Sequence, residues 1–218
     1  MKTILIGTNN PSKLALIRQD LAGLGVECVS PADLHLTDIP AETARSASEN
    51  ALLKAQAWHR ASGLPVITED SGLVFVDLPT DHPDQPGVFV RRVGGNTLTD
   101  EEMLRHYAAC SARHGGALQA AWQDAWCVLI DENTIHLRAD TADTLREHSF
   151  TLLDTPCERR VPGWPLDSLS YFPAAGKYKA DMTREEVMTY YQQKAAGSPS
   201  GREMTREWLR RCVSEWAK

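Results

Sequence analysis

The chain has 218 residues, of which 42% are hydrophobic and 24% charged, so it is long enough to bury a sizeable core and does not have the composition of a disordered chain. It has no run of about 18 apolar residues, so we expect no membrane-spanning helix, and its short apolar start does not fit a secretory signal. The net charge of −6 argues against a nucleic-acid polymer as the main partner. Five scattered cysteines without paired spacing favour reduced thiols and a cytoplasmic location.

The first half of the chain is expected to alternate strands and helices. We predict, in order, a strand at 2–6, a helix from Pro11 to about Leu24, a strand at 26–30, a helix from 46 to about 61 that stops at Gly63, and strands at 65–68 and 73–78. Asn9 or Asn10 would cap the first helix, and Gly25 would end it. Ser46 and Glu49 have the spacing of a capping box. This order predicts parallel strands joined by a right-handed crossover.

The rest of the chain is expected to add a hairpin and more helices. The sequence EDSG at 69–72 predicts a turn between two strands, and the proline-rich residues 79–87 predict an exposed loop. We then expect a helix near 99–113 opened by Thr99 and Glu102, a hairpin of 117–130 with 134–139, and closing helices opened by capping boxes at 183–186 and 200–203. Trp208 and Trp216 would form the apolar face of the last helix. The pattern predicts one α/β domain over residues 1–218 with a strand-rich middle.

The stretch GTNNPSK at 7–13 lies at the end of the first predicted strand. A helix that begins at Pro11 offers free N–H groups and the positive end of its dipole, which favours binding of an anion. Lys13 adds a full positive charge, although a cation in the first turn of a helix is mildly unfavourable for stability. The alternative is a capped turn with a solvated lysine.

Two further stretches carry acidic and basic side chains. Glu69 and Asp70 follow a strand, where carboxylates can hold Mg²⁺ and orient a water, or where Asp70 can simply cap a turn. Asn50 and Lys54 lie one turn apart on one helix face, so Lys54 could reach a phosphate or remain solvated. Glu42 lies in the loop before this helix and has no evident structural role. Together these residues predict a site for a metal and an anionic phosphate chain.

These motifs resemble those of the inosine triphosphate pyrophosphatase family. The family's T-G-N-P-x-K corresponds to Thr8–Lys13, its E-T-G-x-S/T-F-x-E-N-A-x-x-K to Glu42–Lys54, its D-D-S-G-L to Glu69–Leu73, and its P-G-V-Y-S-A-R to Pro86–Arg92. The order and spacing agree over roughly the first hundred residues.

The resemblance implies a fold, an activity and a set of site residues. It implies an elongated mixed β-sheet with flanking helices, two lobes around a central cleft, and a homodimer. It implies Mg²⁺-dependent hydrolysis of non-canonical purine nucleoside triphosphates such as ITP, dITP and XTP to the monophosphate and pyrophosphate. Asp70 would then activate the attacking water, with Glu42 and Asp70 as the metal ligands. The substrate-binding residues carried over from the family's pattern are Thr8, Asn9, Asn10, Lys13, Lys54, Ser71, Trp164, Asp167 and Arg202.

The second half of the chain departs from the family's pattern. The base-reading G-F-G-Y-D-P has its nearest match at 163–168, where Trp164 could stack on a purine or be a core or interface residue. The closing S-H-R corresponds to 200–202 and lacks the histidine, while Ser200 could equally cap a helix with Glu203. A lysine that precedes this motif in the family has only Lys194 nearby. We therefore expect retained phosphate chemistry with relaxed or shifted base specificity.

Other functions remain open from the sequence. A catalytically weak nucleotide-binding or regulatory protein could share the fold, although such a protein would not need Asp70. A structural or interaction protein would have the loop at 79–87 as its only distinct feature. The seven histidines show no metal-ligand spacing, and the sequence assigns them no function.

Overall fold

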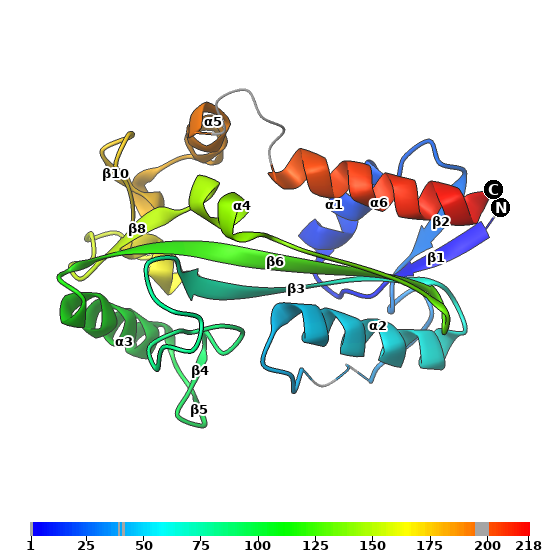
Figure 1. Ribbon diagram of the computed structural model, residues 1–218, viewed down its shortest axis with the longest axis horizontal. Coiled ribbons are helices and arrows are strands. Elements are labelled where there is room, and N and C mark those ends of the chain that lie inside the picture. Colours follow the sequence, from blue (N-terminus) through cyan, green and yellow to red (C-terminus); the bar gives the residue numbers. More distant parts are fainter. Residues whose placement is uncertain (1, 39, 41, 195–200) are drawn as a thin grey trace. The chain divides into compact units, whose positions relative to one another are not determined.

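The computed structural model describes residues 2–38, 40, 42–194 and 201–218 and divides the chain into two compact units (Figure 1). Unit 1 consists of Met1–Ser71, Asp124–Asp140 and Gly201–Lys218, and unit 2 of Gly72–Gln123 and Thr141–Ser200. Two strands, β3 (Val66–Phe75) and β6 (Ala117–Asp131), have residues in both units. The chain is α/β, and its main sheet is mixed, with parallel and antiparallel pairs.

Unit 1 contains the strand–helix–strand arrangement that the sequence predicts. Strand β1 (Lys2–Ile6) pairs in parallel with β2 (Val26–Val29) on one side and with β3 on the other. Helix α1 (Pro11–Asp20) connects β1 to β2, and helix α2 (Ala47–Ser62) precedes β3. The carboxyl end of β1 therefore meets β3 near Ile67, its partner in register with Ile6.

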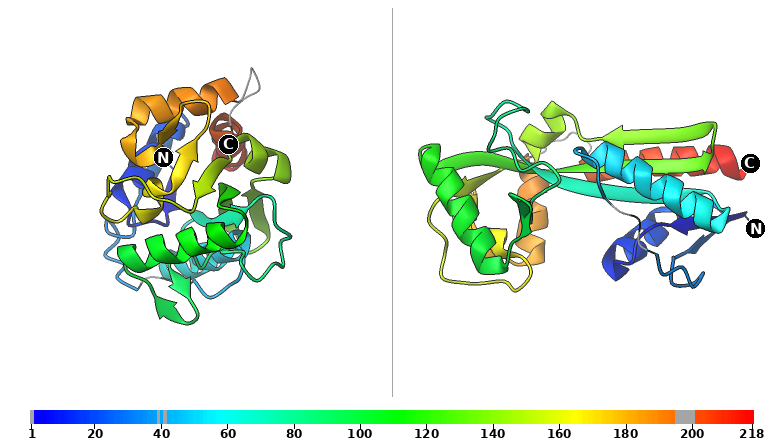
Figure 2. Two further views of the ribbon diagram at one scale, coloured as in Figure 1. Left: turned by 90° about the vertical axis from the view of Figure 1, so that its left-hand side faces the viewer. Right: turned by 90° about the horizontal axis from the view of Figure 1, so that it is seen from below.

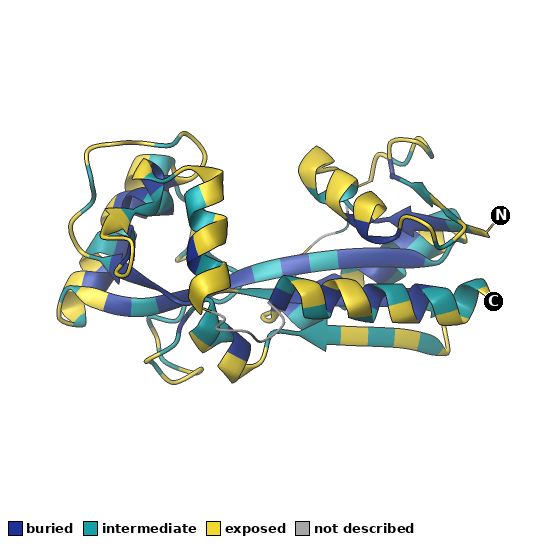
Figure 3. Ribbon diagram, turned by 90° about the horizontal axis from the view of Figure 1, so that it is seen from above, coloured by how far each residue is buried: buried dark blue, intermediate teal, exposed yellow. Residues whose placement is uncertain are grey.

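The side chains of unit 1 alternate between two helical layers. Ile4 and Ile6 of β1 pack in one cluster with α1 and with α6 (Gly201–Ala217), while Leu5 packs with Trp58 of α2. In Figure 1, α6 and α2 accordingly lie on opposite sides of the strands between them. Helix α6 is buried along one face and exposed along the other (Figure 3), and Trp208 and Trp216 pack on the apolar cluster as predicted. Neighbouring residues of β1 pack on opposite helical layers because successive side chains of a strand point to opposite faces of the sheet.

Helix α1 is shorter than predicted. It ends at Asp20 rather than near Leu24, and the N–H of Leu24 donates to the carbonyl of Leu21 in a turn. Gly23 has a φ of 82°, a left-handed conformation that ends the helix before Gly25 is reached.

The predicted turn at residues 69–72 is wrong, because β3 runs through this sequence without a break. Thr68 and Asp70 are buried on one side of the strand, and the Thr68 hydroxyl donates to the carbonyl of Ala51 at 2.6 Å. Asp70 does not cap a turn, since it too bonds to α2. Gly72 allows the backbone of Gly87 to approach β3 closely, because a Cβ at residue 72 would lie 2.6 Å from the carbonyl oxygen of Gly87.

Strand β6 continues into a hairpin with β7 (Thr134–Ala139), as predicted, and Figure 2 shows the two strands side by side. Trp126 and Val128 of β6 join the cluster that contains α6, and Cys127 and Leu129 join the cluster that contains α2. In the order of strands, β6 lies next to β3.

Unit 2 has its own antiparallel strands and core. Residues of β6 in this unit pair with β8 (Phe150–Leu153), which pairs with β9 (Ser170–Phe172), which pairs with β10 (Lys177–Tyr178). The other elements are β4 (Arg92–Val93), β5 (Asn96–Thr97), α3 (Asp100–Arg113), α4 (Ala142–Glu147), α5 (Arg184–Lys194) and two 3-10 turns at Pro165–Ser168 and Lys179–Asp181. Tyr107, Phe150 and Phe172 lie in its apolar core.

Most of the predicted helix starts are confirmed by their hydrogen bonds. Thr99 and Glu102 form a complete capping box at α3, and Thr183 and Glu186 bond reciprocally at α5. Ser46 caps α2, but the Glu49 carboxylate accepts from the Ser46 hydroxyl. The capping box predicted at 200–203 begins outside the described residues. Among the described residues, no helix is long and apolar enough to span a membrane.

Candidate active site in unit 1

The loop between β1 and α1 forms the first part of the site. Asn10, and not Asn9, is the N-cap of α1, and its side-chain oxygen accepts from the N–H groups of Ser12 at 2.9 Å and Lys13 at 3.3 Å. The Thr8 hydroxyl accepts from the N–H of Asn10 at 3.1 Å. Two N–H groups that could hold an anion are therefore already satisfied by the cap.

Gly7 lets the chain leave β1 over a crowded surface. Its N–H donates to the carbonyl of Ile67 at 2.8 Å, which continues the pairing with β3. A Cβ at this position would lie 2.6 Å from the Trp58 ring and 2.8 Å from the Thr68 methyl group. The glycine at this strand end is thus required by the packing of α2 beneath it.

Lys13 joins the first turn of α1 to β3. Its ammonium lies 2.6 Å from the carboxylate of Glu69, whose side chain is only 9% exposed. A lysine at a helix N-terminus is unfavourable by itself, and this carboxylate offsets that cost. The ion pair also places Lys13 beside the residue that precedes Asp70.

Asp70 is held at both carboxylate oxygens by α2. The side-chain amide of Asn50 donates to Oδ2 at 3.1 Å, and the ammonium of Lys54 donates to Oδ1 at 2.9 Å. Asn50 and Lys54 therefore share a helix face, as predicted from their spacing. Asp70 is 8% exposed, so these two donors fix the orientation of a largely buried carboxylate.

Lys54 uses all three of its N–H groups within unit 1. Besides Asp70, it donates to the carbonyl oxygen of Glu69 at 2.7 Å and to the carboxylate of Glu42 at 3.1 Å. The Asn50 side-chain oxygen accepts from the N–H of Ala44 at 2.9 Å, which fastens the loop that carries Glu42. One ammonium thus draws together two carboxylates from distant parts of the sequence, Glu42 and Asp70.

The donor set at Lys54 fits a hard divalent cation. Carboxylate oxygens are the ligands that Mg²⁺ prefers, and Glu42 and Asp70 both present one to the same ammonium. These two oxygens are bridged by a positive charge, so the site is electrostatically suited to a cation. Glu42 is 43% exposed at its side chain, which leaves it reachable from solvent.

Asp124 is an acidic neighbour of this site that the sequence reading did not single out. Burial, together with the carboxylates of Glu69 and Asp140, raises the pKa of Asp124 to about 7. Its backbone N–H donates to the Asp140 carboxylate at 2.9 Å. The signal that could have identified it was a carboxylate in the middle of a strand, directly before the apolar residues 125–130.

Several predicted substrate-binding residues do not join this group. Arg202 pairs with the Asp20 carboxylate, and its buried Nη1 has no hydrogen-bond partner among the described residues. In unit 2, Trp164 is 59% exposed, and Asp167 pairs with Lys179 at 2.9 Å. Ser71 is half-buried in β3. Roles for these residues in substrate binding stay predictions.

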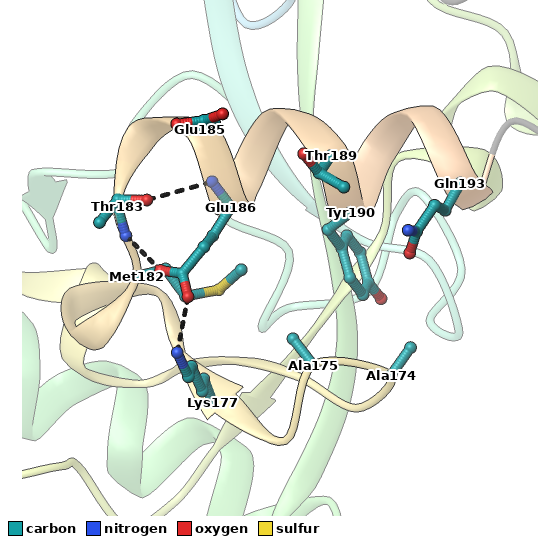
Figure 4. A pocket seen from close by; sticks show the side chains of 10 residues that line it. All are labelled: Ala174, Ala175, Lys177, Met182, Thr183, Glu185, Glu186, Thr189, Tyr190 and Gln193. Atoms are coloured by element: carbon teal, nitrogen blue, oxygen red, sulfur yellow. Dashed lines mark hydrogen bonds and ion pairs between the residues drawn. The ribbon is translucent and has the colours of Figure 1, made fainter.

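Lys194 and a hollow in unit 2 also lie outside this group. The Lys194 ammonium donates to the carbonyl and the hydroxyl of Ser149 at 2.7 and 3.0 Å, and burial lowers its pKa. Figure 4 shows a pocket of about 400 Å³ between β10 and α5, where Lys177 pairs with Glu186 at 2.6 Å. None of the predicted site residues lines this pocket.

Comparison with known proteins identifies the family. Residues 4–145, well over half of the chain, match the model of the Ham1 family. The chain belongs to the Ham1 family. A dITP/XTP pyrophosphatase of Thermus thermophilus is 32% identical over 195 residues, which is 86% of this chain and 84% of the relative. A dITP/XTP pyrophosphatase of Erwinia tasmaniensis is 31% identical over 86% of this chain and 87% of the relative.

Solved structures of Ham1 proteins share the fold. A HAM1 protein from Coxiella burnetii superposes with a TM-score of 0.69 at 24% identity, covering 99% of this chain and 100% of that protein. The Ham1 protein of Staphylococcus aureus gives a TM-score of 0.70 at 20% identity, over 95% and 98%. These structures confirm the mixed α/β fold, and the match to the family model confirms the family predicted from the sequence motifs.

Proposed function

We propose that this Ham1-family protein hydrolyses nucleoside triphosphates with non-canonical purine bases, such as dITP, ITP and XTP, to the monophosphate and pyrophosphate with Mg²⁺. The names of the relatives, which are dITP/XTP pyrophosphatases, support the substrate class. The observation that carries the proposal is the carboxylate of Asp70, fixed between the Asn50 amide and the Lys54 ammonium that also holds Glu42.

Asp70 is proposed as the general base. Each oxygen of an ionised carboxylate has two lone pairs, so Asp70 retains acceptor capacity after bonding to Asn50 and Lys54. It can therefore accept a proton from a water that attacks a phosphorus atom. A positioned base of this kind contributes about 10²–10⁴ to the rate. The Asn50 amide keeps the carboxylate oriented when Lys54 turns to a phosphate, and a fixed orientation is the condition for efficient proton transfer.

Glu42 and Asp70 are proposed to hold Mg²⁺ through their carboxylate oxygens. When bound, this ion lowers the pKa of a coordinated water and neutralises charge on phosphate oxygens. Lys54 donates to both carboxylates in this structure, so it would exchange these bonds for phosphate oxygens in a complex. Lys13 would likewise exchange its ion pair with Glu69 for a phosphate oxygen. Thr8, Asn9 and Asn10, in the loop after β1, are proposed to bind the substrate beside it.

Recognition of the base is proposed to involve residues of the second half of the chain. The exposed ring of Trp164 supports a stacking role, and Asp167 lies three residues further on. Arg202 is proposed as a further contact, supported by its buried Nη1, which lacks a hydrogen-bond partner within the part of the chain that the structure describes. We infer a relaxed base preference, because the sequence lacks the family's histidine before Arg202. We also propose a homodimer in the cytoplasm. The location is supported by five cysteines that are all free thiols.

The test is release of pyrophosphate in the presence of Mg²⁺ from ITP, XTP, dITP and the four standard dNTPs. Asp70→Asn keeps the shape of the side chain and removes the base, so we expect kcat to fall by about 10²–10⁴. Asp131→Asn is the matched control in unit 1, because Asp131 is exposed at the end of β6. Activity that survives Asp70→Asn would refute the assigned base. If nucleotides bind but none of them releases pyrophosphate, the proposed hydrolase activity is refuted.

A further inference from the structure

Unit 2 contains a cluster of metal-ligating side chains that the proposed hydrolysis does not use. His82, Asp84 and His114 each place one ligand atom within 4.8 Å of those of the other two, and all three residues are partly exposed. His82 and Asp84 belong to the proline-rich loop at 79–87, and His114 is the C-cap of α3. The sequence spacing gives no sign of this cluster, because His114 is distant along the chain.

The loop that carries two of these residues is braced by hydrogen bonds. The Gln85 side chain accepts from the N–H of Phe75 at 2.9 Å and donates to the carbonyls of Phe75 and Leu78 at 2.8 and 3.1 Å. Gln85 also donates its N–H to the carbonyl of His82 at 2.9 Å. Ligands on a braced loop lose little conformational freedom when an ion binds, which favours affinity.

Hydrogen bonds connect the three residues of the cluster. The Nε2 atom of His114 lies 2.8 Å from Oδ2 of Asp84, so a metal ion could replace the proton that they share. The Nδ1 atom of His82 accepts from the N–H of Asp84 at 3.1 Å. The Asp84 carboxylate accepts from Arg113 at 2.6 Å through Oδ1 and lies 2.8 Å from His114 through Oδ2, so both of its oxygens are held in place.

The distances require only small movements to form a coordination sphere. Ligand atoms around tetrahedral Zn²⁺ lie about 3.4 Å apart, given Zn–N and Zn–O bonds of about 2.1 Å. The pair of His114 and Asp84 would open by about half an ångström from 2.8 Å. His82 would close by at most about 1.4 Å, since its ligand atom lies within 4.8 Å of the other two.

Nearby charges act in opposite directions on a bound cation. Arg113 lies 2.6 Å from the other carboxylate oxygen, Oδ1 of Asp84, where it repels a cation but also orients the carboxylate. The negative end of the α3 dipole lies beside His114, and it attracts a cation. His106 and Cys110 also lie near Arg113 and Asp84, and burial lowers the pKa of His106 and raises that of the Cys110 thiol.

We propose that His82, Asp84 and His114 form a binding site for a first-row transition metal ion such as Zn²⁺, separate from the magnesium site of unit 1. Two imidazoles and one carboxylate are a donor set of intermediate softness, which favours Zn²⁺ over Mg²⁺. The bound ion ties the loop at 79–87 to the end of α3. It therefore stabilises unit 2 and takes no part in phosphate chemistry.

The experiment is calorimetric titration of the full-length, chelator-treated protein with ZnCl₂ in excess Mg²⁺, which keeps the unit 1 carboxylates occupied. We expect one tight equivalent of Zn²⁺ and a rise in the melting temperature. His82→Gln and His114→Gln each remove one ligand. Loss of a residue that only supports a metal ligand already weakens metal binding by about tenfold or more, so loss of a ligand should weaken it at least as much. His136→Gln, on β7 in unit 1, is the control and should leave binding unchanged.

Further measurements separate loss of a ligand from loss of the fold. Without zinc, each histidine variant should melt like the wild type. Co²⁺ in place of Zn²⁺ should give visible absorption bands that the His82→Gln variant lacks. Absence of a tight equivalent in the wild type would overturn the site. Retention of wild-type affinity within about twofold in both histidine variants of the cluster would also overturn it.

Discussion

Replacement of Lys54 by methionine tests whether its ammonium holds the candidate site together. Lys54 donates to Asp70, to Glu42 and to the carbonyl of Glu69, and its side chain is only 12% exposed. Methionine matches the length of the lysine stem and removes the charge and the three donors. The Asp70 carboxylate, 10% exposed at its side chain, would then retain the Asn50 amide but lose the Lys54 ammonium.

The expected cost follows from this burial. Removing one partner of a buried ion pair costs about 3–5 kcal/mol of unfolding free energy, because it leaves an uncompensated charge. For a chain of this size, about 2–4 °C of melting temperature corresponds to each kcal/mol, so we expect a fall of about 6–20 °C. Lys177→Met is the matched control. Its ion pair with Glu186 has a similar length, 2.6 Å, but the two side chains are 47% and 41% exposed, so we expect at most about 1 kcal/mol.

The assay is urea unfolding of the wild type, Lys54→Met, Asp70→Asn, the variant that combines these two changes, and the control Lys177→Met. Because the double variant removes the stranded charge, it should be more stable than Lys54→Met alone, with a coupling energy of about 0.5–3 kcal/mol. A cost below about 1 kcal/mol for Lys54→Met, equal to that of Lys177→Met, would contradict this reasoning. Strict additivity in the double variant would contradict it as well.

Three further predictions concern unit 1. Burial and two neighbouring carboxylates raise the pKa of Asp124 to about 7, so the folded state retains a proton that the unfolded state loses, and stability falls as the pH rises from about 4 to 7. Asp124→Asn should therefore be more stable than the wild type at pH 8, by up to about 4 kcal/mol, and not at pH 4; equal urea midpoint shifts at both pH values would contradict this. Gly7→Ala should cost about 1–3 kcal/mol in thermal melts, because its Cβ would meet the Trp58 ring at 2.6 Å, and wild-type stability would show that the ring moves freely. Asn10→Ala should cost about 1 kcal/mol by removing the cap on Ser12 N–H, while Asn10→Asp should restore most of it.

Local signals predicted much of unit 1 correctly. The helical spacing of Asn50 and Lys54 placed both on one face, and both reach Asp70. The parallel pairing of β1 with β2 followed from their order in the chain. These features depend on the spacing of residues that are close in the chain, which can be read from the sequence without knowledge of the fold.

The errors arose where tertiary contacts override local preference. Residues 69–72 have the composition of a turn, but hydrogen bonds that join α2 to Asp70 and Thr68 hold them in an extended strand. Lys54 donates all three of its hydrogen bonds to residues that are distant in the sequence, and the pKa of Asp124 is raised by neighbours that are distant in the sequence as well. The approach of His82 to His114 likewise depends on the fold, so no local pattern could have predicted it.

The contact between Gly72 and Gly87 limits how this chain can change over generations. A side chain at Gly72 would displace the Gly87 carbonyl, which accepts from the N–H of Leu73 at 2.9 Å, and Gly87 itself has a φ of 55°. The two positions favour glycine for different reasons, Gly72 because a Cβ would meet the Gly87 carbonyl and Gly87 because its φ is left-handed. The loop at 79–87 is therefore anchored at its C-terminal end, and the side chain of Gln85 fastens it to Phe75 and Leu78. Insertions and deletions should be rare between Gln85 and Gly87, because they would shift the residue that meets Gly72.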